Sequence, residues 1–326
     1  MPSAIPSSRQ FHPGMNEFEL IGRLVRDLPG NDRVVVGAGD DCAVLDLGLV
    51  DRWLLFKTDA VVEGVHFTAE TPAHLVGRKA LARCLSDIAA MAGDPTGALV
   101  TLALPAGFDA ARVEAAYTGL NQLAREFGVA IVGGETTTSP GGWLISVALL
   151  GTVARDRCVL RSGARAGDAL FVTGELGGAL RGKHLEFTPR LAEARWLAGH
   201  FRVHAMLDLS DGLAGDLRHL LNASGVGAEL LADAIPVSRA AKLQARDHPT
   251  AHPPLTAALA DGEDFELLFA VAPAEAVPLA DAWRTAFPGV RLSCVGRVSA
   301  EPGLRLRDRR GIRPLAAHGY AHFQQP

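Results

Sequence analysis

The chain has 326 residues and a formal net charge of −4 at neutral pH. At roughly 100–200 residues per domain, this length predicts two domains. Hydrophobic residues make up 48% and charged residues 21% of the chain, which is typical of a folded protein and excludes a largely disordered one. The slightly acidic balance disfavours a general nucleic-acid binder, which would need a basic face. A small anionic ligand would therefore need local cations or metal ions.

Cysteine usage and the first residues predict where the protein works. The four cysteines are scattered and form no CxxC pair, which favours a reduced, cytoplasmic protein. The opening stretch "MPSAIPSSRQFHPG" has no apolar run of signal-peptide length, and no later run is long enough to span a membrane. We therefore expect a disordered tail over residues 1–14 and no association with membranes.

The stretch "LLFKTDAVVEGVHF" (54–67) predicts an apolar strand that runs into Thr58 and Asp59 and then bends at Glu63 and Gly64. Side chains two apart in a strand share a face, so Lys57 should point the same way as Asp59. An ammonium group beside a candidate metal-binding carboxylate is unusual. The simpler alternative is that Lys57 ends an exposed strand.

The next segments alternate helix and strand. "DAARVEAAYTGLNQLAREFG" (109–128) has apolar residues at helical spacing and predicts an amphipathic helix, capped by Asp109 at its start and Gly128 at its end. "VAIV" (129–132) predicts a short buried strand that breaks at the following glycine pair, and "WLISVALLGTVA" (143–154) predicts another strand.

The pattern restarts after Arg155, where "GARAGDALFVTG" predicts a turn that feeds a strand. Further strands are expected at "FELLFAVA" and "LSCVGRV", with helices around 212–223 and 274–286. We place the domain boundary near residue 155, which gives an N-terminal domain over 15–155 and a C-terminal domain over 156–326.

Carboxylates recur beside glycines, mostly where strands are expected to end. Convergent carboxylates are typical of a divalent metal site, because Mg²⁺ prefers oxygen ligands and shares them with substrate phosphates. Each segment alone is weak, since Asp-Gly and Gly-Asp also form ordinary turns. Asp87 could merely pair with Arg83 one helical turn away, and Asp211 could cap a helix. The carboxylates are Asp40, Asp41, Asp59, Glu63, Asp87, Asp94, Glu135, Asp208, Asp211, Asp216, Asp261, Glu263 and Asp264.

Several familiar motifs are missing from the sequence. There is no GxxxxGK[ST] loop and no HRD or DFG set, so the two standard phosphate cradles are absent. There is also no HExxH or Cys/His zinc spacing and no GxSxG elbow. Metal ions would have to do the work that a P-loop lysine does elsewhere.

Six motifs in order resemble the thiamine-monophosphate kinase family, which belongs to the superfamily of aminoimidazole ribonucleotide synthetase and selenophosphate synthetase. They are "GAGDDCAVL", "KTDAVVEGVHF", "KALARCLSDIAAMAGDP", "VGGETT", "LDLSDGL" and "DGEDFELL", followed by a terminal "GYAHF". The resemblance implies an α/β protein with mixed sheets and a two-domain aminoimidazole ribonucleotide synthetase-like fold. Its N-terminal domain would form a homodimer by joining sheets into a central barrel.

The same resemblance implies a reaction between ATP and thiamine monophosphate that gives ADP and thiamine diphosphate. Both substrates would lie in a cleft near the dimer interface, bridged by several Mg²⁺ ions, and the phosphoryl group would move directly and in line. The nucleophile is already a phosphate oxygen, so no residue need act as a strong general base.

The resemblance also assigns site residues. The implied metal ligands are Asp41, Thr58, Asp59, Asp87, Glu135, Asp208 and Asp211. The implied nucleotide contacts are Thr58, Gly134, Glu135, Arg161 and Ser210, with Tyr117 as a further candidate whose place on an apolar helix face favours core packing. The implied substrate contacts are His66, Glu263 and Tyr320.

Two residues depart from the family pattern. Glu135 stands where the family has aspartate, which moves the carboxylate by about 1.5 Å, more than Mg²⁺ with bonds of about 2.0–2.1 Å tolerates without compensation. Lys57 stands where the family has serine or threonine. Our hypothesis is that its ammonium group replaces one Mg²⁺, pairs with Asp59 and can reach a phosphate oxygen.

Three alternatives remain open at this point. A superfamily paralogue could act on another small-molecule acceptor. A nucleotide-binding protein could have lost turnover through the changes at Lys57 and Glu135. A metal-dependent phosphohydrolase would share the carboxylates but would not require Arg161.

Overall fold

The computed structural model describes residues 17–248, 251–316 and 319–320. The tail predicted over residues 1–14 lies outside the described residues, so that prediction stays open. Residues 17–31, with helix α1 (Glu17–Leu24), belong to a unit separate from residues 32–320. Among the described residues, no helix is long and apolar enough to cross a membrane.

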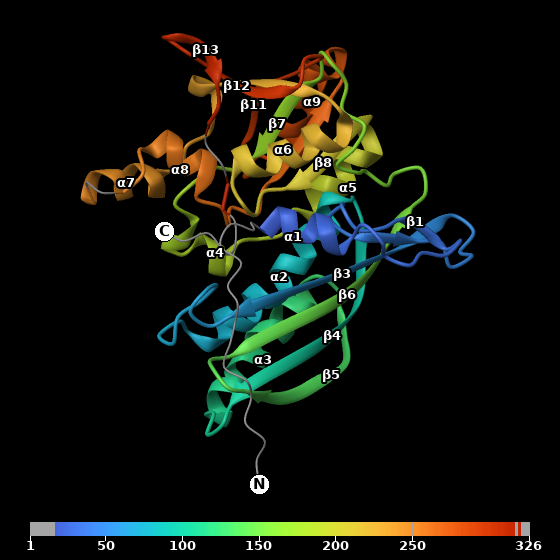
Figure 1. The fold of residues 1–326 in the computed structure, drawn as a ribbon, viewed down its shortest axis with the longest axis vertical. Helices are drawn as coiled ribbons and strands as arrows, with labels where there is room; N and C mark the ends of the chain where they lie inside the picture. The colour runs from blue at the N-terminus through green and yellow to red at the C-terminus, as the bar shows by residue number, and fades with distance from the viewer. Residues whose placement is uncertain (1–16, 249–250, 317–318, 321–326) are drawn as a thin grey trace. The chain divides into compact units, whose positions relative to one another are not determined.

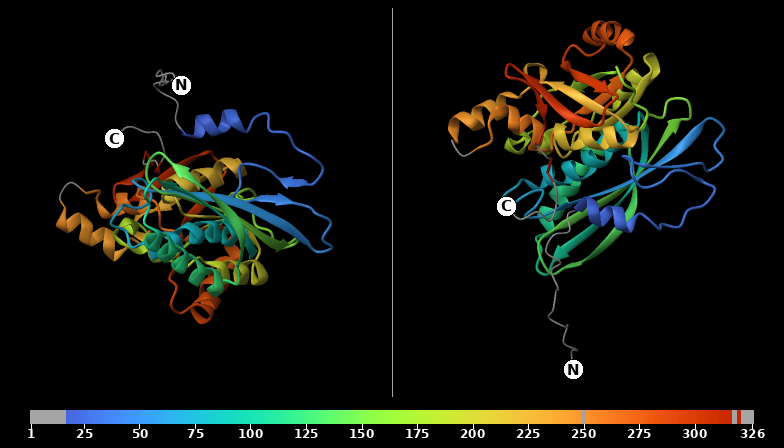
Figure 2. Two further views of the ribbon diagram at one scale, coloured as in Figure 1. Left: turned by 90° about the horizontal axis from the view of Figure 1, so that it is seen from below. Right: turned by 45° about the horizontal axis from the view of Figure 1, so that its top comes forward.

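The first sheet has six strands in the order β1-β2-β3-β6-β4-β5 (Figure 1). Strands β4 and β5 are parallel, and the other neighbours are antiparallel. Helices α2 (Ala73–Ala90) and α3 (Ala110–Glu126) lie along one face of this sheet (Figure 2). The strands are β1 (Val34–Val36), β2 (Ala43–Leu45), β3 (Arg52–Val62), β4 (Asp94–Pro105), β5 (Ala130–Ser139) and β6 (Leu144–Ala154).

The second sheet has seven strands in the order β13-β12-β9-β11-β7-β10-β8, with only β12 and β9 parallel. The strands are β7 (Ala169–Thr173), β8 (Val203–Asp208), β9 (Gly227–Leu231), β10 (Leu267–Val271), β11 (Leu292–Ser299), β12 (Gly303–Asp308) and β13 (Gly311–Pro314). Both sheets are therefore mixed, and the α/β class with mixed sheets is confirmed.

Helices cover both faces of the second sheet. Leu170 and Val172 of β7 belong to a core with α6 (Leu213–Ser224) and α8 (Pro254–Ala260). Phe171, which points the other way, belongs to a core that also contains residues of α2, α5 (Leu191–His200) and α9 (Pro273–Ala286). Because α2 contributes to this second core, the two halves of the chain share buried surface. The remaining helices are α4 (Lys183–Glu186) and α7 (Arg239–Asp247).

Most predicted elements are confirmed. Helix α3 starts directly after Asp109, whose side chain accepts a hydrogen bond from Ala111 N at 2.9 Å, and Gly128 follows its end with a φ of 68°. The strands and helices expected after residue 155 also form, as β7, β10, β11, α6 and α9. The boundary near residue 155 remains a proposal.

The prediction for residues 129–134 was wrong. Strand β5 does not break at Gly133 and Gly134 but continues to Ser139, and most of its residues are exposed because it is an edge strand. A Cβ on Gly134 would lie 1.8 Å from the carbonyl oxygen of Val100 on the parallel neighbour β4. The glycine therefore permits close strand pairing here instead of ending the strand.

Helices α2 and α3 approach each other closely at two glycines. A Cβ on Gly119 would lie 1.8 Å from the carbonyl oxygen of His74, and one on Gly77 equally close to that of Ala116. Backbone atoms cannot move aside as a flexible side chain can, so any larger residue must push the helices apart.

We expect Gly119→Ala to lower the free energy of unfolding by about 3 kcal/mol. Helix propensity favours alanine by only about 1 kcal/mol, so the steric cost decides the sign. Gly199→Ala in α5 is the matched control, because its added Cβ would meet only Arg157 Nη1, at 3.6 Å. Urea titrations of both variants measure the difference, and equal midpoints would contradict the close approach.

Candidate active site

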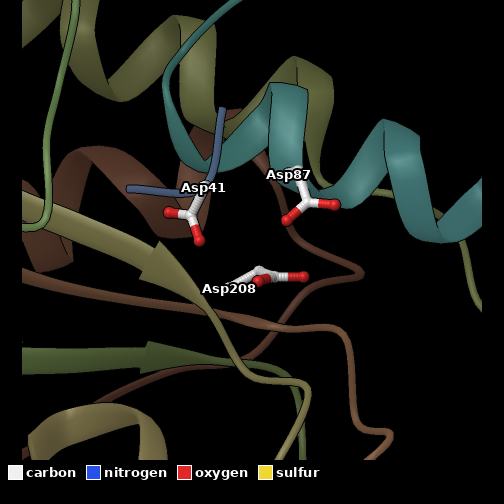
Figure 3. Close-up of side chains that lie close together, drawn as sticks. All are labelled: Asp41, Asp87 and Asp208. Carbon is white, nitrogen blue, oxygen red and sulfur yellow. The ribbon is translucent and has the colours of Figure 1, made fainter. Parts of the chain in front are cut away.

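Three buried carboxylates converge where the two halves of the chain meet (Figure 3). Asp41 precedes β2, Asp87 lies near the end of α2, and Asp208 ends β8. One carboxylate oxygen from each lies within 4.8 Å of the others. Each of these residues is at most 6% exposed. Like charges held this close away from water require a cation or a proton.

The electrostatics of this carboxylate cluster point the same way. Burial and the neighbouring Asp41 carboxylate raise the pKa of Asp208 to about 7. The Oδ2 atom of Asp41 is buried and has no hydrogen-bond partner among the described residues. An unpartnered buried carboxylate oxygen is costly, so the donor set fits an oxygen-liganded divalent cation such as Mg²⁺.

Two side chains form hydrogen bonds to carboxylates of the cluster. Arg161, in the segment between the two sheets, donates from Nε to Asp41 Oδ1 at 3.1 Å. Ser86 on α2 donates from Oγ to Asp208 Oδ2 at 2.5 Å. The residue implied as a phosphate contact, Arg161, therefore already lies against one of the implied metal ligands.

Lys57 points into this cluster. It lies on the same face of β3 as Asp59, as strand periodicity predicted, and β3 continues to Val62, so Lys57 does not end a strand. Its partner differs from our hypothesis, because Lys57 Nζ lies 2.8 Å from Asp87 Oδ1 and does not pair directly with Asp59. Burial alone would lower the pKa of Lys57, but the Asp87 and Asp59 carboxylates outweigh it and raise that pKa well above its usual value. The ammonium is therefore charged.

Asp59 pairs with a different cation. Arg83 on α2 reaches Asp59 Oδ2 from Nε at 3.5 Å and Glu263 Oε1 from Nη1 at 3.3 Å. The simple alternative of a pair between Arg83 and Asp87 along the helix is therefore wrong, since each has a partner on another element.

A second group of polar side chains surrounds Lys79, which lies one turn before Arg83 on α2. Lys79 has no exposed surface. Its Nζ donates to the backbone oxygen of His66 at 2.8 Å, lies 2.8 Å from His184 Nδ1, and forms an ion pair with Glu263. We call Lys79, His184 and Glu263 the buried triad. Lys79, Arg83 and Asp87 follow one another at i, i+4 and i+8, on one side of α2.

One member of the buried triad, His184, lines a pocket of about 490 Å³. The wall comes from the turn after β3 and from the segment that includes α4. The lining residues are Gly64, Val65, His66, Phe67, Thr68, Thr71, Leu180, Arg181, Gly182, His184 and Leu185. The implied substrate contact His66 therefore borders a pocket large enough for part of a small molecule.

The loop that carries Glu263 is held in an unusual conformation. Glu263 has a φ of 60°, rare for a residue other than glycine, and its backbone nitrogen donates to the carbonyl oxygen of Ser210 at 2.6 Å. The nitrogen of Tyr320 donates to the carbonyl oxygen of Asp211 at 2.8 Å. Four implied site residues thus come together, and such strain is typical of functional loops.

Asp211 does not cap α6, because the cap position is Gly212 and no side chain caps the helix. The backbone nitrogen of Asp211 instead donates to the buried carboxylate of Asp216 at 3.0 Å. Burial and the Asp211 carboxylate raise the pKa of Asp216 well above its usual range.

Other implied residues lie elsewhere within the chain. Thr58 is exposed on the opposite face of β3 from Lys57, and its hydroxyl lies 3.4 Å from that of Ser146. Glu135 is exposed on the edge strand β5, next to Gly134, and its side chain accepts a hydrogen bond from the backbone nitrogen of Thr136 at 3.1 Å. Tyr117 packs partly buried against the core. The structure does not bring these residues to the carboxylate cluster.

Sequence reasoning missed Lys79 and His184. Lys79 lies within the quoted motif "KALARCLSDIAAMAGDP", where polar residues at spacing four interrupt an otherwise apolar helix. That spacing is a usable signal for a polar face turned inward. His184 lies in no motif, and nothing local distinguishes it.

The sequence matches models of known protein families in both halves of the chain. Residues 39–153 match the family model described as AIR synthase related protein, N-terminal domain. Residues 165–309 match the corresponding C-terminal domain.

Individual relatives are similar over most of the chain. The thiamine-monophosphate kinase of Rhodopirellula baltica is 44% identical over 87% of this chain and 89% of its own length. That of Salmonella typhimurium is 34% identical over 95% and 99%. A solved structure of AaThiL complexed with AMPPCP and TMP superposes with a TM-score of 0.79 at 30% identity, covering 94% of this chain and 97% of that one.

Proposed function

Because the chain belongs to the thiamine-monophosphate kinase family, we propose that it transfers the γ-phosphoryl group of ATP to thiamine monophosphate. A phosphate oxygen of the acceptor would form the new P–O bond as the bond to ADP breaks, which gives ADP and thiamine diphosphate. The ATP analogue AMPPCP bound to a relative supports ATP as the phosphoryl donor.

The observation that carries this proposal is the carboxylate cluster of Asp41, Asp87 and Asp208, with its unpartnered buried oxygen beside Arg161. These residues would hold one or more Mg²⁺ ions. Bound there, Mg²⁺ supplies neutralising charge for the transferring phosphoryl group.

The chain's own side chains would position the donor. The Arg161 guanidinium has five N–H donors, and only some of them are engaged by Asp41. Its free donors suit a phosphate oxygen, where charge-assisted bonds are strongest. Asp59, Ser210 and Asp211 remain further candidates beside the cluster, and in-line transfer would need no general base.

The pocket beside His66 is our candidate for the acceptor. Its volume of about 490 Å³ suits the ring portion of the acceptor, while the acceptor's phosphate would extend toward the carboxylate cluster. The backbone nitrogen of Tyr320 bonds to the carbonyl oxygen of Asp211, and the ring of Tyr320 is exposed. An exposed aromatic ring suits stacking on a heterocycle.

We also propose that the chain forms a homodimer through the first sheet. Phe56 and Leu150 are cross-strand neighbours on the face away from α2, and both are exposed. Leu99 is also exposed, and it pairs with Ala148, two residues before Leu150 on β6. An exposed apolar sheet face is typical of an interface. Thr58 and Glu135 are exposed on the same sheet. If they bind nucleotide, they would do so at that interface.

The proposed reaction is tested with the purified full chain, ATP, Mg²⁺ and thiamine monophosphate, followed by ³¹P NMR. We expect thiamine diphosphate and ADP in equal amounts. ADP with free phosphate, independent of the acceptor, would indicate a phosphohydrolase. Absence of any change would indicate a binding protein, and turnover only with other phosphate esters would indicate a paralogue.

The contact between Lys57 and Asp87 leads to a prediction on metal stoichiometry. An ammonium 4 Å from a divalent cation is repelled by roughly 8 kcal/mol at an effective dielectric of 20. We therefore propose that Lys57 occupies the place of one ion, and Lys57→Thr should bind one more Mn²⁺ per chain in the presence of AMPPCP. Electron paramagnetic resonance of free Mn²⁺ counts the ions, with Lys242→Thr on α7 as control. Equal counts in parent and Lys57→Thr would refute the replacement.

A further inference from the structure

We propose that Lys183 is a positioning residue for the acceptor, because its ammonium group closes the loop over residues 175–183 and so fixes one wall of the acceptor pocket. This inference rests on the proposed function, since it concerns the pocket assigned to the acceptor of that reaction. It adds to that function a residue that lies outside both the pocket lining and the carboxylate cluster.

The loop over residues 175–183 forms part of the pocket wall. Leu180, Arg181 and Gly182 line the pocket, and the chain continues from there into α4. Gly178 has a φ of 70° and Gly182 a φ of 135°. Glycines with positive φ leave many backbone conformations open to the loop. Contacts at its two ends must therefore select the conformation observed.

Lys183 joins the two ends of this loop. Its Nζ donates to the carbonyl oxygen of Glu175 at 3.0 Å and to Oε1 of Glu266 at 2.8 Å. Near the first end, the backbone nitrogen of Gly177 donates to the buried carboxylate of Asp264 at 2.8 Å. One ammonium group thus ties the start of the loop to its end, and both to the residue that precedes β10.

The carboxylate of Glu266 is a firm anchor for this contact. It is 1% exposed and accepts four hydrogen bonds, which matches the four lone-pair sites of its two oxygens. Besides Lys183, the donors are Thr173 Oγ1 at 2.7 Å and Arg190, from Nε at 2.7 Å and from Nη2 at 2.9 Å. Burial would raise the pKa of Glu266, but the charges of Lys183 and Arg190 outweigh it and lower that pKa. The carboxylate is therefore ionised, and it would keep three donors without Lys183.

The same anchor is linked to the carboxylate cluster. The carbonyl oxygen of Glu266 accepts a hydrogen bond from the backbone nitrogen of Leu209 at 2.8 Å. Leu209 directly follows Asp208, which belongs to the cluster. Through Glu266, Lys183 therefore holds the pocket wall in a fixed position relative to the proposed site of phosphoryl transfer.

A wall that is already formed favours binding. A loop that must become ordered when a ligand binds lowers the affinity for that ligand. The apparent Kd rises in inverse proportion to the fraction of molecules whose loop is in the binding-competent form. Loss of the ammonium group would lower that fraction without removing any group that lines the pocket.

Lys183→Met tests this role. Methionine keeps an unbranched side chain but has no N–H donor. We expect the Kd for thiamine monophosphate, measured by calorimetry without ATP, to rise about 5–20-fold. The Kd for AMPPCP with Mg²⁺ should stay within about twofold of the parent value, because no ligand of the cluster is changed. Hydrogen–deuterium exchange over residues 175–183 should become faster.

Arg190→Met is the matched control. It removes two of the four hydrogen bonds to Glu266, but Arg190 lies outside the pocket lining. We expect a lower melting temperature, because a buried carboxylate loses a charged partner, with a Kd for thiamine monophosphate within about twofold of the parent value. If Lys183 only neutralised Glu266, the two variants would behave alike. An unchanged Kd in Lys183→Met, or an equal rise in both variants, would overturn the positioning role.

The outcome for this inference is distinguishable from that for the proposed function, because neither calorimetry nor hydrogen exchange needs turnover. A protein that binds thiamine monophosphate but forms no thiamine diphosphate would contradict only the proposed function. A parent chain that forms thiamine diphosphate, with a Lys183→Met variant that binds the acceptor as tightly, would contradict only the role of Lys183.

Discussion

Asp208→Asn should lower kcat by about 10²–10³-fold while the protein stays folded. The substitution removes one of three converging carboxylates, and losing a single electrostatic contact of this kind in a dry site typically has that effect. Asparagine is nearly isosteric and its oxygen can still accept from Ser86 Oγ. Since the pKa of Asp208 is raised to about 7, a neutral side chain is well tolerated there.

Thermal unfolding and steady-state kinetics check this prediction together. Without metal, the melting temperature of Asp208→Asn should equal or exceed that of the parent, because repulsion from Asp41 is relieved. Asp168→Asn is the matched control, since Asp168 is equally buried but pairs with His204 at 2.8 Å, outside the cluster. Near-normal turnover by Asp208→Asn would remove Asp208 from the cation site.

Leu99→Glu should convert the proposed homodimer into monomers at micromolar concentration. Leu99 is 49% exposed on the uncovered face of the first sheet, and two-fold symmetry would bury the new carboxylate twice. An unpaired charge in an interface costs about 3–5 kcal/mol, so the dimer Kd should rise by more than about 1000-fold.

Analytical ultracentrifugation measures this change. Val277→Glu is the control, because Val277 is an exposed apolar residue of α9, in the other half of the chain. If the parent chain sediments as a monomer, the interface proposal is wrong. If Leu99→Glu stays dimeric, the interface lies elsewhere.

Local sequence patterns predicted the elements well where one physical rule decided the outcome. Helix α3 begins and ends as its cap residues indicated, and Lys57 shares a face with Asp59 because the period of a strand is two. The forecast at Gly133 was wrong because glycine both ends strands and permits close pairing within them. Only the position of β4, with the Val100 carbonyl oxygen against Gly134, decides between these.

Contacts between side chains that lie far apart in the chain could not be predicted from the sequence. Asp87 has Arg83 one turn away, yet it pairs with Lys57, thirty residues earlier. The contact between Lys79 and His184 joins residues 105 positions apart. Nothing in either local pattern identifies such a partner, because it depends on how α2 and α4 pack.

Helix α2 also sets a length. The buried triad begins at Lys79 and the carboxylate cluster includes Asp87, and eight residues at 1.5 Å each separate their backbones by about 12 Å. A rigid helix of this kind would hold the proposed acceptor pocket and the carboxylate cluster at a constant spacing. The enzyme would then select acceptors by their length. A molecule shorter than this spacing would fill the pocket without bringing its phosphate to the donor. A one-residue insertion between Lys79 and Asp87 would turn one end by about 100° and uncouple binding from transfer.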